Sequence, residues 1–134
     1  IKPEVEVFDK GMVDMAIRLN KKGIIKSPMH FDFVMGVNGG ISGTARDLNF
    51  MVESIPAGST WTASGVGRAE FPMVTMAILM GGHARVGFED NVYLSKGVMA
   101  KSNGELVEKV VRLAKELGRE IATPAEAREI LGLK

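Results

Sequence analysis

The pattern of apolar and polar positions predicts four strand-then-helix units and one further short helix. Short runs rich in β-branched and aromatic residues, bounded by turn-forming residues, indicate strands at residues 3–8, 29–35, 59–66 and 83–89. Apolar residues three or four positions apart indicate helices at about 12–19, 45–54, 72–80, 103–117 and 124–131. Repeated strand–helix units place the strands parallel to one another, with the helices between them.

The ends of the last two helices carry specific signals. Gly118 follows the apolar stripe of the longest helix and is a plausible stop. Thr123 and Glu126 have the spacing of a capping box, with Pro124 at the first helical position. The final helix is therefore expected to begin directly after Thr123.

Two architectures fit parallel strand–helix units: a doubly wound sheet or half of a (β/α)8 barrel. A whole barrel takes about 250 residues, and this chain has 134. Glu4 and Glu6 alternate with valines in the first strand, and Thr60, Thr62 and Ser64 alternate with apolar residues in the third. Because strands covered on both faces are usually apolar throughout, this alternation favours the α/β half-barrel. We expect residues 1–134 to form one C-terminal half-barrel domain, incomplete without an N-terminal half.

Composition narrows the possible partners. Apolar residues make up 46% of the chain, charged residues 25%, and the net charge is +1. This profile is typical of a globular protein and gives no electrostatic case for binding nucleic acid or an anionic membrane. No apolar run is long enough to span a bilayer, and cysteine is absent. The first residue is Ile rather than Met, which favours a piece of a longer protein, and the cytoplasm is the expected location.

The most informative segment is GGHARVGFEDNVYL, residues 81–94. Alternation in a strand places Arg85, Gly87 and Glu89 on one face, with Glu89 and Asp90 at the carboxyl end where barrel enzymes carry catalytic groups. A carboxylate there can bind zinc, and Arg85 suits a carboxylate substrate. Asp90 shares that face only if the strand ends or bulges at Glu89. An Arg–carboxylate pair that merely holds the strand end together is an equal alternative.

Two further patterns are weaker. Glu4 and Glu6 share one strand face, which indicates either a cation site or a simply hydrophilic edge. The loop GVNGGISG, residues 36–43, could bring the backbone N–H groups of Gly39 and Gly40 to a phosphate or carboxylate. It lacks the ending of a P-loop, and a flexible turn explains it equally well.

The histidines do not form a metal site by themselves. His30 and His83 are the only two, and both fall near strand starts, so a structural role is favoured for each. A catalytic zinc needs about three protein ligands. If Glu89 is one of them, the others lie outside this chain.

Together, PEVEVFDKGM, HFDFVMGVNGGISG, TWTASGVGR, GGHARVGFEDNVYL and ATPAEAREILGL resemble the β-keto acid cleavage enzyme family over the whole chain. The resemblance implies a (β/α)8 barrel about twice this length, with this chain as strands five to eight. It also implies that a β-keto acid reacts with acetyl-CoA to give acetoacetate and a new acyl-CoA. Members are often tetramers, so we expect a homo-oligomer.

The resemblance assigns roles to individual residues. Glu89 matches a zinc ligand whose His-X-His partners are absent here. Arg85 and Asp90 match residues that work with a serine from an early strand, and Glu6 matches a Glu near the substrate. The chain is therefore expected to be inactive alone, and the sequence does not identify the β-keto acid.

Two other interpretations stay open. A stand-alone half-barrel could be a non-catalytic module that dimerises through its unpaired strand edges. A doubly wound phosphate-binding enzyme could use the glycine-rich loop at residues 36–43, although no standard phosphate motif supports it.

Overall fold

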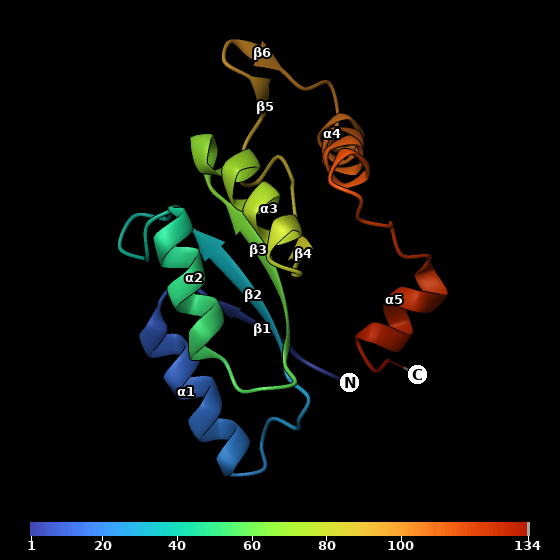
Figure 1. The fold of residues 1–134 in the computed structure, drawn as a ribbon. Helices are drawn as coiled ribbons and strands as arrows, with labels where there is room; N and C mark the ends of the chain where they lie inside the picture. Colours follow the sequence, from blue (N-terminus) through green and yellow to red (C-terminus); the bar gives the residue numbers. More distant parts are fainter. Residues whose placement is uncertain (134) are drawn as a thin grey trace.

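The computed structural model describes residues 1–133 and contains a parallel four-stranded sheet whose strands are linked by helices (Figure 1). The sheet is formed by β1 (Glu4–Val7), β2 (His30–Met35), β3 (Thr60–Gly65) and β4 (His83–Ala84). The helices are α1 (Lys10–Lys21), α2 (Ala45–Ser54), α3 (Glu70–Leu79), α4 (Asn103–Glu116) and α5 (Pro124–Ile130). A 3₁₀ turn, η1 (Gly67–Ala69), precedes α3, and a small hairpin of β5 (Tyr93–Ser95) and β6 (Val98–Met99) precedes α4.

The order of the strands in the sheet is the order of the chain, β1-β2-β3-β4. Glu6 is in register with Asp32, Asp32 with Thr62, and Thr62 with His83. A doubly wound sheet reverses direction at a switch point, and no such reversal occurs within residues 1–133. The α/β class with parallel strands is therefore confirmed, and the order favours a barrel-type progression.

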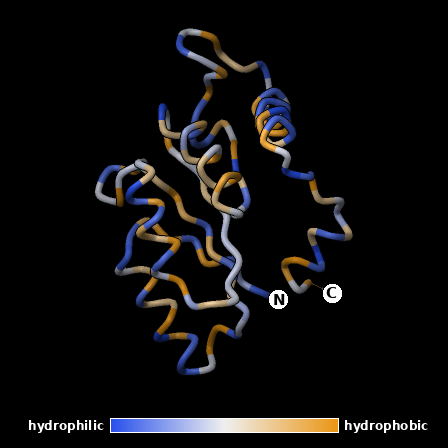
Figure 2. Tube along the Cα trace, in the orientation of Figure 1, coloured by the Kyte–Doolittle hydropathy of each residue, from blue (hydrophilic) through white to orange (hydrophobic). Residues whose placement is uncertain are grey.

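The sheet has one apolar and one polar face. Helices α1, α2 and α3 lie along the same side of the sheet (Figure 1) and pack on its apolar face. Figure 2 shows hydrophobic and hydrophilic residues alternating along α1 and α2, which is the pattern of helices with one covered side, whereas α3 is apolar over most of its length. The core formed there includes Val7, Phe31, Phe33, Met35, Trp61 and Ala63 from the strands and Val13, Leu48, Met51, Met73 and Ala77 from the helices.

The last two helices lie beyond this core. Arg119, after α4, donates to the carbonyl oxygens of Ile78 and Gly82 and so ties this segment to the end of α3. Lys2 donates to the carbonyl of Leu131 at 2.6 Å, which holds the end of α5 beside the N-terminus. Within the described part of the chain, no helix has the length and apolarity needed to cross a bilayer.

Three sequence predictions were wrong in detail. The strand expected at residues 83–89 ends at Ala84, because the backbone then turns. Helix α3 begins at Glu70, two residues before Pro72, which is tolerated in the first turn because its missing N–H has no helical partner there. The loop expected before α4 contains the β5–β6 hairpin, whose two strands are too short to give a clear pattern.

Candidate functional site

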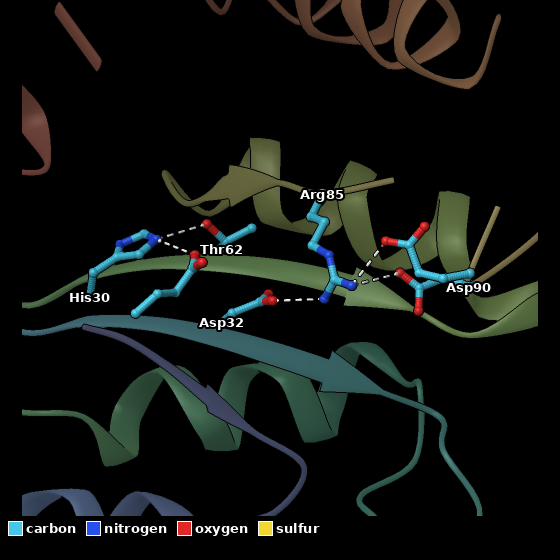
Figure 3. Close-up of polar contacts among 7 residues, drawn as sticks. His30, Asp32, Thr62, Arg85 and Asp90 are labelled. Carbon is cyan, nitrogen blue, oxygen red and sulfur yellow. Dashed lines mark hydrogen bonds and ion pairs between the residues drawn. The ribbon is translucent and has the colours of Figure 1, made fainter. Parts of the chain in front are cut away.

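Arg85 is at the centre of the candidate site, immediately after the end of β4. Its Nη1 lies 2.8 Å from Oδ2 of Asp32, and its Nη2 lies 3.0 Å from Oε1 of Glu89 (Figure 3). Asp90 approaches the same guanidinium, with Oδ2 at 3.8 Å from Nη2. One guanidinium therefore faces three carboxylates, one from within β2 and two from the turn that follows β4.

The turn after β4 explains how Glu89 and Asp90 face the same side. Arg85 makes the last bond to the sheet, from its backbone N–H to the carbonyl of Ala63, and the N–H of Asp90 then bonds back to Gly87. The side chain of Glu89 folds over Gly87, where a Cβ would lie 2.2 Å from Oε2 of Glu89. The strict alternation of a longer strand, which would have separated the two carboxylates, does not apply.

Asp32 is a site residue that the sequence reasoning missed. It is 3% exposed on the polar face of β2. Burial raises its pKa to about 6, although the hydrogen bond from Arg85 acts in the opposite direction. A single carboxylate within the largely apolar run HFDFVM was the available signal, because a buried carboxylate requires a partner.

The two acidic residues of the turn differ in environment. Glu89 has 55% of its side chain exposed, and its pKa is lowered by its own backbone N–H and by Arg85. Asp90 has 7% of its side chain exposed, and burial raises its pKa. Glu89 is thus a charged and accessible carboxylate, whereas Asp90 is a largely buried one, better suited to hold or transfer a proton.

Three buried oxygens have no hydrogen-bond partner among residues 1–133: Oδ1 of Asp32, Oγ of Ser64 and Oδ2 of Asp90. Asp32 and Ser64 both belong to the polar face of the sheet. Unpaired buried polar atoms are costly, and most are explained by a missing partner. The polar face therefore offers acceptors to a ligand or to further polypeptide.

Glu70 is the second residue that the sequence reasoning missed. It is fully buried at the first position of α3, and burial raises its pKa. Its Oε1 accepts from the backbone N–H of Gly87 at 3.2 Å, and its Oε2 accepts from Nδ2 of Asn91 at 2.9 Å. These two donors flank Glu89 and Asp90, so Glu70 fixes both ends of the turn that carries them. Its surroundings in the sequence are those of an ordinary helix start and gave no sign of this role.

Of the remaining candidate residues, Glu6 lies beside this cluster, whereas Gly39 and Gly40 line another cavity. Glu6 is exposed on β1 beside Asp32, and its negative charge helps to raise the pKa of Asp32 and of Asp90. Gly39 and Gly40 line a separate cavity of about 660 Å³. A Cβ on Gly40 would lie 2.8 Å from the carbonyl oxygen of Phe8, so close packing alone requires glycine there.

His30 is held by hydrogen bonds rather than left free. Its Nδ1 lies 2.8 Å from Oγ1 of Thr60. Its Nε2 lies 3.1 Å from Oε1 of Glu4 and 3.2 Å from Oγ1 of Thr62, the latter contact labelled in Figure 3. Among residues 1–133, no three His, Cys, Asp or Glu side chains are grouped so that they could hold a metal ion. The donor chemistry of Glu89 fits a single position in a zinc shell and no more.

Comparisons with known proteins show which family this chain resembles along its whole sequence. A 3-keto-5-aminohexanoate cleavage enzyme of Fusobacterium nucleatum is 72% identical over 134 residues, which are 100% of this chain and 48% of the relative. A 3-oxoadipate:acetyl-CoA acetyltransferase of Cupriavidus necator is 40% identical over 99% of this chain and 48% of its own length. A 3-dehydrocarnitine:acetyl-CoA trimethylamine transferase of Rhizobium meliloti is 36% identical over 99% of this chain and 44% of its own length.

The chain thus spans about half the length of the relatives that it matches. The sequence profile described as beta-keto acid cleavage enzyme matches residues 1–133. Because this match covers residues 1–133 and relatives are up to 72% identical, this chain belongs to the beta-keto acid cleavage enzyme family.

Proposed function

We propose that this chain is the C-terminal half of a (β/α)8 barrel and acts only together with an N-terminal half. Its match to about half of each relative supports this arrangement. So do the outer strands β1 and β4, each of which has a neighbour on one side only within residues 1–133. Apolar side chains around α4 also remain open to solvent, with Val107, Leu117 and Ile121 exposed by 47%, 43% and 50%. Such surfaces are normally covered.

The proposed reaction joins a β-keto acid with acetyl-CoA and returns acetoacetate and a new acyl-CoA. The single observation that carries this proposal is the cluster of Arg85, Glu89 and Asp90 at the carboxyl end of a parallel sheet, in a chain of this family. The names of two relatives, an acetyl-CoA acetyltransferase and an acetyl-CoA trimethylamine transferase, support acetyl-CoA as the second substrate.

Each residue of the cluster has a proposed part in this chemistry. Arg85 holds the substrate carboxylate with its fork of donors and neutralises charge that develops beside it. Asp90, whose pKa is raised by burial, holds or passes a proton at its Oδ2, which lacks a hydrogen-bond partner among residues 1–133. Glu6, on β1 and in register with Asp32 of β2, borders the substrate. The backbone N–H groups of Gly39 and Gly40 are candidate contacts for the co-substrate.

Glu89 is the proposed zinc ligand of this half. The other donors are a pair of histidines from the N-terminal half, as the family resemblance implies. Zinc held there would supply a positive charge that polarises the keto group of the substrate. Within this chain, the backbone N–H of Glu89 and the guanidinium of Arg85 lower the pKa of Glu89 and keep its carboxylate charged, and Arg85 orients it for that position.

The proposal is tested by fusing this chain behind the N-terminal half of the Fusobacterium nucleatum relative; we call this fusion the reconstituted protein. We expect it to bind about one zinc ion per chain and to consume 3-keto-5-aminohexanoate only when acetyl-CoA is present. The isolated chain should show neither property. A reconstituted protein that folds, binds no zinc and leaves both substrates unchanged would show that the proposed function is wrong.

The exposed apolar surface near α4 also fits the alternative of a non-catalytic module that pairs with a second copy. Sedimentation of the isolated chain distinguishes the half-barrel enzyme from the self-pairing module. A stable, well-folded homodimer would favour the module, whereas recovery of activity on fusion favours the half-barrel enzyme. We propose that the complete enzyme is a cytoplasmic homo-oligomer, with a tetramer as the expected form.

Glu70→Gln in the reconstituted protein should lower kcat about 10-fold and destabilise the fold by about 1–3 kcal/mol. The amide keeps one acceptor oxygen but turns an NH₂ group toward either Gly87 or Asn91, so one end of the turn is released. Steady-state kinetics and thermal unfolding measure the two effects. Glu53→Gln, an exposed change on α2, is the control. Unchanged kcat despite the loss of stability would limit Glu70 to a purely structural role.

A further inference from the structure

A cavity of about 730 Å³ lies between the start of α3 and the β5–β6 hairpin. Its apolar wall is formed by Phe71, Phe88, Val92 and Tyr93. This volume falls within the range of about 300–1,000 Å³ that is usual for small-molecule and cofactor sites. The remaining lining residues are Gly67, Arg68, Asp90, Asn91, Ser95, Lys96 and Gly97.

The cavity reaches the reaction cluster through Asp90. This side chain lines the cavity and also lies 3.8 Å from the guanidinium of Arg85. It is 7% exposed, and its Oδ2 has no hydrogen-bond partner among residues 1–133. A ligand in the cavity would therefore lie beside the largely buried carboxylate that borders the cluster.

Two exposed cations border the same cavity. Neither Arg68 nor Lys96 is paired with a carboxylate in the part of the chain that the structure describes. Arg68 also lines the cavity of the glycine-rich loop, so it lies where the two hollows adjoin. Unpaired cations beside an apolar wall suit a ligand with an uncharged arm and a phosphorylated end.

One wall of the cavity is fixed in place. Lys109 lies 3.6 Å from the ring centroid of Phe71 and donates to the carbonyl of Leu94 in β5, so it ties α4 to both sides of the cavity. Asn91 adds a second tie, because its amide donates both to Glu70 and to the carbonyl of Tyr93. The hollow therefore has defined walls on the helix side and at the base of the hairpin.

We propose that this cavity binds the acyl-CoA co-substrate. The pantetheine arm lies against Phe71, Phe88 and Tyr93, and the thioester end lies beside Asp90. The phosphate groups at the other end of the molecule contact Arg68 and Lys96. This assignment rests on the proposed function, and it explains why Asp90 faces both the cavity and Arg85.

The double charge reversal Arg68→Glu, Lys96→Glu in the reconstituted protein tests the assignment. We expect the KM for acetyl-CoA to rise at least about 10-fold, since two phosphate contacts become repulsive. The KM for the β-keto acid and the zinc content should change less than about twofold. Lys115→Glu, an exposed reversal on α4, is the matched control.

A truncated substrate makes the test sharper. S-acetylpantetheine carries the thioester and the arm but no phosphate, so the double variant and the unaltered protein should use it equally well. An equal loss with both substrates would show that the changes damage the fold or the reaction rather than phosphate contacts, and would overturn the assignment. So would an unaltered KM for acetyl-CoA.

Calorimetric titration with free CoA separates this inference from the proposed reaction. If the protein shows no turnover but the double reversal weakens its binding of CoA, the result would support the cavity as a CoA site and contradict the proposed reaction. If the protein turns over and the double reversal does not change its affinity for acetyl-CoA, the result would support the reaction and contradict the assignment of the cavity as the CoA site. A change of subunit number with unchanged CoA binding would make the cavity a subunit interface and overturn the proposal.

Discussion

Glu89→Gln in the reconstituted protein is expected to remove bound zinc and to lower kcat by at least about 1,000-fold. The amide has nearly the size of the carboxylate but lacks its charge, and a neutral oxygen is a poor zinc ligand. Because Glu89 is 55% exposed and sits in a turn, the change should have little effect on folding. Zinc content by atomic emission and steady-state kinetics give the two readouts.

The control for this change is Glu53→Gln, which removes one exposed carboxylate from α2. It should retain both zinc and turnover. If Glu89→Gln kept its zinc and most of its activity, the metal assignment would be wrong. Glu89 would then be only the carboxylate that holds Arg85 at the end of β4, which is the alternative that the sequence left open.

Arg85→Ala should lower kcat by about 100- to 1,000-fold while zinc stays bound. The change removes the fork of donors proposed to hold the substrate carboxylate but leaves Glu89 in place. It also leaves Asp32 buried without its cation at 2.8 Å. Because Arg85 is 34% exposed, we expect a loss of about 1–3 kcal/mol in the free energy of unfolding, less than for a fully buried pair.

A second variant separates the two effects of losing Arg85. In the double change Arg85→Ala, Asp32→Asn, the buried carboxylate is replaced by a neutral amide, so part of the stability should return. Turnover should stay low, since the donor fork is still missing. Loss of zinc in Arg85→Ala would instead give Arg85 the purely structural task of orienting Glu89.

Much of the fold followed from patterns that act over a few residues. The capping box at Thr123 and Glu126 is present, and α5 begins at Pro124 as expected. The strands at β2 and β3 and the helices α2 and α4 begin and end within one residue of their predicted limits. In each case a local signal, such as an apolar run or a capping residue, agrees with the tertiary environment.

The sequence was less informative where distant segments decide the structure. The end of β4 at Ala84 follows from the turn at Gly87, whose ends are fixed by Glu70 from another element. The pairing of Asp32 with Arg85 joins residues 53 positions apart, and no periodicity encodes such a contact. Arg85, Glu89 and Asp90 could be grouped from the sequence because all three lie within one short segment, and the structure places them together. Their roles stay predictions. The buried residues that hold this group in place, Asp32 and Glu70, were not predicted.

The most direct test of this account is X-ray absorption at the zinc edge of the reconstituted protein, together with its crystal structure. We predict a zinc ion coordinated by one carboxylate oxygen of Glu89 at about 2.0–2.2 Å and by two imidazole nitrogens from the N-terminal half. A zinc ion bound elsewhere, or a metal-free protein that turns over both substrates with Glu89 paired only to Arg85, would contradict it.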